Sequence, residues 1–82
     1  MLEHLALSES GFLFDARTGS TYSLNRTGTF VLRELIAGTP LGNLPERLRE
    51  AFEVDAETAA RDVEQLLFRL KFLGVIPEEG AK

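Results

Sequence analysis

The stretch FDARTGSTYSLNRTG, residues 14–28, constrains the fold more than any other part of the chain, because it holds a turn, a strand and the start of a helix. Asp15 can accept hydrogen bonds from the backbone of the turn that follows it, and Gly19 supplies the positive φ that closes a short loop. The segment 11–15 before this loop is largely apolar, and the segment 20–25 after it alternates polar and apolar residues. The two segments are therefore predicted to pair as an antiparallel hairpin.

Helical patterns follow the hairpin. Asn25 and Asp55 are suited to cap the first and the third of these helices, and a glycine directly follows each of the two. The helices are expected at 26–37, 44–52 and 56–73. With a further short strand expected at 2–7, the sequence predicts a small α+β, winged-helix-like domain in which antiparallel strands precede three helices.

The length of 82 residues suits one domain, whose core would bury about 60% of the surface that the unfolded chain exposes. A single domain is expected over 1–77, with 78–82 as a frayed tail. Neither a signal peptide nor a stretch long enough to span a bilayer is recognisable, so no membrane partner and a cytoplasmic location are expected.

The charge balance argues against nucleic acid as a partner. Nine basic residues stand against thirteen acidic ones, which gives a net charge of −4, and no run of Lys or Arg occurs. The absence of cysteine excludes disulfides, thiolate metal sites and a Cys nucleophile. The chain is therefore expected to carry no cofactor of its own.

Catalysis is hard to build from these residues. His4 is the single histidine and is expected on the surface, without a nucleophile motif near it. Glu53, Asp55 and Glu57 lack the glycine and the terminal glutamate of a calcium-binding loop and are interpreted as helix-end charges. The sequence predicts a protein that is not an enzyme.

The third helix carries apolar residues on two opposite faces. Phe68 and Phe72 lie nearly opposite the main apolar stripe, so either a strand or the C-terminal tail covers them, or they contact a partner, which includes a second copy of the chain. The stripe itself is formed by Ala59, Val63, Leu66, Leu67, Leu70 and Leu73.

A winged-helix domain can also bind DNA through its third helix, and this alternative stays open. The basic residues of that helix are balanced by acidic ones, and its exposed centre is aromatic, whereas base recognition uses Asn, Gln or Arg. The charged residues that cancel are Arg61, Arg69 and Lys71 against Glu57, Asp62 and Glu64.

The ordered set LFDARTGSTYSLNRTGTFVLREL, Gly38 and LREAFEVDAETAARDVEQLLFRLKFLGVI resembles the PqqD family, the leader-peptide-binding proteins of pyrroloquinoline quinone biosynthesis. The same domain is the recognition element of other ribosomally made, modified peptides. The resemblance covers about residues 10–77 and rests on Asp15, Thr18, Gly19, Tyr22, Leu24, Asn25, Gly28, Asp62, Val63, Leu67, Leu70, Gly74 and Ile76.

The resemblance implies that a leader peptide binds as an added strand, against the last strand of the hairpin and beside the third helix. The strand edge would then be Ser20, Thr21, Tyr22, Ser23, Leu24 and Asn25. The helix wall would be Asp62, Gln65, Leu66, Arg69 and Phe72. Two of these have a structural alternative: Asp62 as a cap or an arginine partner, and Leu66 as a core residue.

The resemblance further implies an adaptor that holds the leader of a precursor peptide and presents the rest of that peptide to a modifying enzyme, often a radical S-adenosylmethionine enzyme. Any iron–sulfur cluster would belong to that enzyme, because this chain has no cysteine. The alternatives are a winged-helix DNA-binding or regulatory module and a homodimerising interaction domain.

Overall fold

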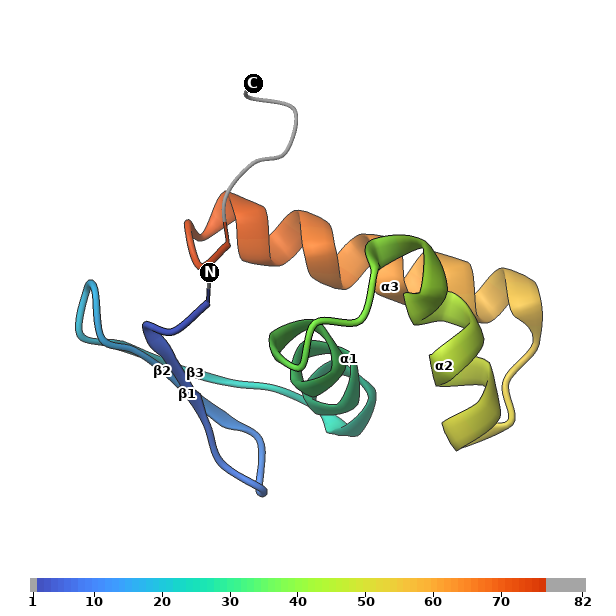
Figure 1. The fold of residues 1–82 in the computed structure, drawn as a ribbon, viewed down its shortest axis with the longest axis horizontal. Helices are drawn as coiled ribbons and strands as arrows, with labels where there is room; N and C mark the ends of the chain where they lie inside the picture. The colour runs from blue at the N-terminus through green and yellow to red at the C-terminus, as the bar shows by residue number, and fades with distance from the viewer. Residues whose placement is uncertain (1, 77–82) are drawn as a thin grey trace.

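The computed structural model describes residues 2–76, as a three-stranded antiparallel sheet followed by three α-helices (Figure 1). The strands are β1 (Leu5–Leu7), β2 (Phe12–Asp15) and β3 (Ser20–Ser23). The helices are α1 (Arg26–Ile36), α2 (Leu44–Phe52) and α3 (Ala56–Phe72), with a 3₁₀ turn at Leu41–Asn43 before α2. The predicted α+β order of strands and helices is confirmed, and the predicted tail at 78–82 lies outside the described residues.

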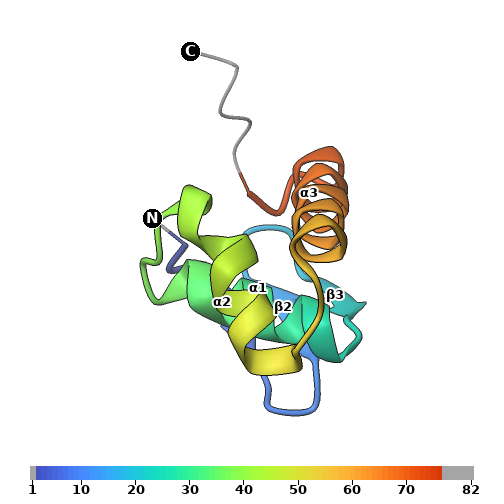
Figure 2. The same cartoon turned by 90° about the vertical axis from the view of Figure 1, so that its right-hand side faces the viewer.

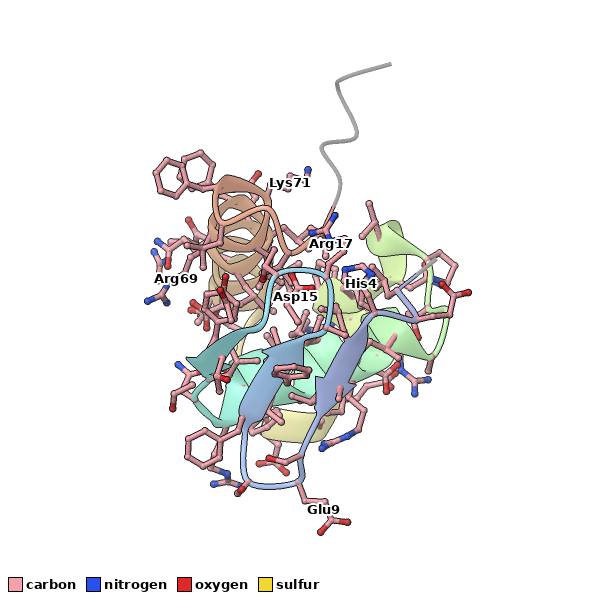
Figure 3. All side chains as sticks on the ribbon, turned by 90° about the vertical axis from the view of Figure 1, so that its left-hand side faces the viewer. His4, Glu9, Asp15, Arg17, Arg69 and Lys71 are labelled. Carbon is pink, nitrogen blue, oxygen red and sulfur yellow. The ribbon has the colours of Figure 1, made fainter. Side chains whose placement is uncertain are left out.

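The sheet has β2 in the centre and β1 and β3 at its edges. In the view of Figure 3, α1 and α2 lie behind the sheet and α3 lies above its β3 side. The predicted hairpin is confirmed: Phe12 pairs with Ser23, and Asp15 pairs with Ser20. Asp15 Oδ1 accepts the backbone N–H of Arg17 at 2.9 Å, and Gly19 has a φ of 80°. Local turn chemistry therefore sets the register of β3.

β1 is shorter than the strand expected at 2–7. The amide of Leu5 donates to the carbonyl of Leu2 at 3.1 Å, which folds the first described residues into a turn. Extended pairing with β2 therefore begins only at Leu5.

Side-chain caps begin two of the helices, as predicted. Asn25 Oδ1 accepts the N–H of Gly28 at 2.7 Å, and Asp55 Oδ1 accepts the N–H of Thr58 at 2.7 Å. The observed helix bounds agree with the predicted ones within one residue. None of the helices within residues 2–76 combines the length and the apolar composition needed to cross a membrane.

Two apolar clusters form the core, and α3 contributes to both. The first joins the sheet to the chain around the end of α3, and comprises Leu13, Leu32, Leu70, Val75 and Ile76. The second lies among the helices and comprises Val31, Leu44, Leu48, Ala59 and Val63. Leu66 and Leu67 pack against both clusters, so α3 is held between the sheet and the other two helices.

Polar contacts fasten the chain after α3 to the sheet. The Arg17 side chain in the hairpin loop donates to the carbonyl of Gly74 and also contacts buried Asp15 at 3.5 Å. His4 Nε2 lies 3.1 Å from the carbonyl oxygen of Val75. His4 is therefore half-buried and hydrogen-bonded, so the expectation of a surface histidine is wrong. Local sequence could not indicate this, because the partner of His4 lies 71 residues away.

These contacts also fix the relative direction of β3 and α3. The loop that precedes β3 touches the end of α3 through Arg17 and Gly74, while β3 runs from that loop toward α1. The two elements are therefore antiparallel (Figure 1). Figure 2 shows α3 on the β3 side of the sheet.

Candidate functional site

The outer edge of β3 is an unpaired strand edge within the described residues. The amide of Leu24 donates to the carbonyl of Gly11 at 2.8 Å, so the backbone groups of Leu24 point toward β2. Because backbone direction alternates along an antiparallel strand, the N–H and C=O groups of Thr21 and Ser23 point away from β2. These groups can accept the backbone of one further strand.

A groove of about 810 Å³ lies between the end of β3, the start of α1 and the middle of α3. We call it the β3–α3 groove. Its lining residues are Ser23, Leu24, Asn25, Thr27, Gly28, Val31, Leu48, Asp62, Glu64, Gln65, Leu66, Phe68 and Arg69.

Gly28 keeps the floor of this groove open. A methyl group at this position would lie 3.6 Å from Leu66 Cδ1, 3.7 Å from Leu24 Cβ and 3.0 Å from Asn25 Oδ1. Gly28 therefore permits close packing at the start of α1. Without a side chain here, Leu24 and Leu66 both lie close to the first turn of α1.

The deeper part of the groove is apolar. Val31 of α1 and Leu48 of α2 are buried members of the second core cluster, and both reach the groove. Leu24 and Leu66 are half-buried and line the groove while packing against the core. Leu66 therefore serves the core and the groove together, and an apolar ligand side chain would meet a matching surface here.

The α3 wall of the groove carries charges that are free to pair. Within residues 2–76, Asp62, Glu64 and Arg69 have neither a hydrogen bond nor an ion pair through their side chains. The alternative that Asp62 caps a helix or pairs with an arginine is therefore not seen in this part of the chain. In the same part, no three His, Asp or Glu side chains are placed to hold a metal ion.

Phe68 and Phe72 form a stacked pair on the outer side of α3, with ring centroids 6.4 Å apart. They are 72% and 77% exposed, and they lie away from the buried stripe, as predicted. Phe68 borders the β3–α3 groove and Phe72 does not. Leu73, predicted in the stripe, follows the end of α3 and is 42% exposed.

The structure brings together most of the residues predicted from the resemblance. Those that line the groove are Ser23, Leu24, Asn25, Asp62, Gln65, Leu66 and Arg69. The others are Ser20, Thr21, Tyr22 and Phe72. Of these, Thr21 belongs to the open strand edge and Tyr22 packs against the first core cluster, while Phe72 as a peptide contact stays a prediction.

Sequence reasoning missed the α1 and α2 side of the groove. On that side the missed lining residues are Thr27, Gly28, Val31 and Leu48, and on α3 the residue Glu64 was missed as well. Phe68 was expected as a contact for a partner and was not included in the predicted peptide site. A signal was present for three of the missed residues, because Thr27, Gly28 and Val31 share one face of α1 at helical spacing. Leu48 reaches the groove only through the packing of α2, which no local pattern encodes.

Comparison with known proteins gives a family and a structural relative. The family model described as coenzyme PQQ synthesis protein D (PqqD) matches residues 10–76. A solved structure described as lasso peptide synthetase B1 complexed with the leader peptide is similar over 85% of this chain and 84% of that chain, at 30% sequence identity and a TM-score of 0.70. A search of curated proteins gave no match. This chain belongs to the PqqD family.

Proposed function

We propose that this protein binds the leader segment of a ribosomally made precursor peptide as a fourth strand on β3. The observation that carries the proposal is the β3–α3 groove, in which an unpaired strand edge and an apolar floor lie side by side. The similar lasso peptide synthetase B1 is described in complex with a leader peptide, which supports the same class of ligand.

Strand addition uses the two kinds of surface for different purposes. The outward N–H and C=O groups of Thr21 and Ser23 supply backbone hydrogen bonds, which any peptide sequence can make. Alternate side chains of the added strand point into the groove, where Leu24 and Leu66 would receive an apolar residue. Affinity thus comes from the edge, and selectivity comes from the groove.

The role that follows is that of an adaptor for a modifying enzyme, such as a radical S-adenosylmethionine enzyme. Holding the leader raises the local concentration of the remaining precursor at that enzyme without chemistry by this chain. The iron–sulfur cluster of such an enzyme would have its own ligands, because this chain contains no cysteine.

The experiment is a selection of random linear dodecapeptides, displayed on their mRNA, on the immobilised protein. The most enriched peptide is then titrated by fluorescence anisotropy against wild type, Ser23→Pro and Ser23→Ala. Proline removes the outward N–H, a change that edge strands tolerate, whereas alanine keeps it. Ser23→Pro is expected to weaken binding about tenfold, and Ser23→Ala to bind as wild type.

Circular dichroism and the urea midpoint establish that each variant is folded before its affinity is compared. Equal affinity of folded Ser23→Pro and Ser23→Ala would contradict strand addition on β3. Failure to enrich any peptide on wild type over a column without protein would contradict the proposed function itself.

A further inference from the structure

The side of α3 that lines the groove carries two charges of opposite sign, Asp62 and Arg69, on the same helix face. Asp62 and Arg69 are seven residues apart, so they point within about 20° of each other and lie about 10 Å apart along the helix axis. Both line the β3–α3 groove, and neither has an ion-pairing partner within residues 2–76. Figure 3 shows Arg69 projecting from α3 on the side where β3 forms the sheet edge.

The surface between these two charges is apolar at its base. Leu66 lies one helical turn beyond Asp62, and Leu66 and Leu24 both lie close to Gly28. Along α3 the groove therefore offers an acidic site at Asp62, an apolar base at Leu66 with the amide of Gln65 beside it, and a basic site at Arg69. Glu64, which also lines the groove, adds negative charge nearer to the Asp62 end than to the Arg69 end.

The spacing of these sites matches that of an added strand. Side chains on one face of a strand recur every second residue, so a residue and its fourth successor are about 13 Å apart. This distance on the added strand exceeds the axial distance between Asp62 and Arg69 by only a few ångströms. Long charged side chains at the two strand positions can bridge that difference. The residue midway between them would face Leu66.

The direction of the strand fixes the order of the charges. β3 and α3 are antiparallel, because the loop before β3 contacts Gly74 at the end of α3. A peptide antiparallel to β3, which is the commoner and slightly more stable pairing, therefore runs in the same direction as α3. It meets Asp62 first and Arg69 last.

We infer that the groove selects a peptide segment with a basic, an apolar and an acidic side chain at alternate positions, in this order from N- to C-terminus. The inference rests on the proposed function and names the chemistry of its ligand.

Two synthetic peptides of equal composition test it. Both are variants of the peptide enriched in the selection, with Lys-Thr-Leu-Thr-Glu or Glu-Thr-Leu-Thr-Lys at its centre. Wild type is expected to bind the first about tenfold more tightly, since two weak attractions become two repulsions in the second. The preference should shrink as salt rises.

A double charge reversal and a matched control locate the effect. The Asp62→Lys/Arg69→Glu protein is expected to prefer the second peptide. Glu46→Arg/Arg49→Glu reverses an ion pair of α2 outside the groove, without altering net charge, and should leave the preference as in wild type.

The remaining outcomes of the peptide titrations contradict either the inference alone or the proposed function as well. Equal binding of the two peptides, or the opposite preference in wild type, overturns the inference, and the proposed function survives if Ser23→Pro still weakens both. Binding of the selected peptide but of neither designed peptide also overturns the inference. If wild type binds none of the three, the proposed function fails together with the inference.

Discussion

Replacing Gly11 by alanine should destabilise the protein far more than the same change at Gly38. The two glycines have nearly equal φ values, 97° and 101°. Adding a side chain therefore costs the same backbone strain at both positions, about 1–2 kcal/mol. At Gly38 a Cβ atom would have no neighbour within 4 Å among residues 2–76. At Gly11 it would lie 2.7 Å from the carbonyl oxygen of Leu24 and 3.0 Å from Thr29 Oγ1.

The collision at Gly11 adds a second cost. Relieving it requires the Leu24 carbonyl to move, although the Leu24 amide is bonded to Gly11 at 2.8 Å. Overpacking of this kind typically costs about 1–3 kcal/mol. The total for Gly11→Ala is then roughly 2–5 kcal/mol, against about 1–2 kcal/mol for Gly38→Ala. A domain of 82 residues has a total stability of only about 4–12 kcal/mol.

Urea denaturation followed by circular dichroism measures both changes, with Gly38→Ala as the internal reference for strain. Because Leu24 and Thr29 join the end of β3 to the start of α1, the Gly11→Ala protein should also lose affinity for the selected peptide. Equal free energies of unfolding for the two variants would refute the contact between Gly11 and the Leu24 carbonyl.

Three further predictions follow from α3 and from the charge of the chain. Leu70 is 2% exposed and Phe72 is 77% exposed, so Leu70→Asp should unfold the protein and Phe72→Asp should leave the urea midpoint nearly unchanged; unfolding of both would place Phe72 in the core. Hydrogen bonds from the side chain and then the backbone of Thr58 lower the pKa of Asp55 from its ordinary 3.8, so the folded state should lose stability as the pH falls below about that value. Asp55→Asn keeps a hydrogen-bond acceptor at the cap but cannot titrate, so it should reduce this loss of stability at low pH. Identical dependence of stability on pH in wild type and Asp55→Asn would contradict the prediction. With a net charge of −4, the protein should show no salt-sensitive mobility shift with duplex DNA.

The elements could be predicted from the sequence because their signals are local. Asn25 and Asp55 cap the helices that they were expected to cap, and the Asp15 to Gly19 loop sets the hairpin as its turn residues indicate. Each of these signals acts over a few residues, so it depends little on tertiary packing.

The groove could be predicted only in part, because its far wall depends on contacts between distant segments. Leu48 reaches the groove through the packing of α2, and the direction of α3 relative to β3 is fixed by Arg17 and Gly74. His4 was misjudged for the same reason, since its partner Val75 follows α3. Spacing along the chain does not encode such pairs.

The outer face of the sheet also escaped sequence analysis. Phe12 and Phe14 alternate with buried Leu13 and Asp15, and they are 55% and 44% exposed. Their aromatic character indicates a strand but does not indicate which face of the sheet is covered. The helices pack on the face that carries Leu13, so the face that carries Phe12 and Phe14 stays exposed.

Residue-resolved amide hydrogen exchange, measured by NMR with and without the selected peptide, tests the central claim most directly. The amides of Thr21 and Ser23 point away from β2, so strand addition should slow their exchange strongly. The amides of Tyr22 and Leu24 point toward β2 and should change little. If the saturated complex leaves the exchange of Thr21 and Ser23 as in the free protein, the peptide does not bind as a strand on β3.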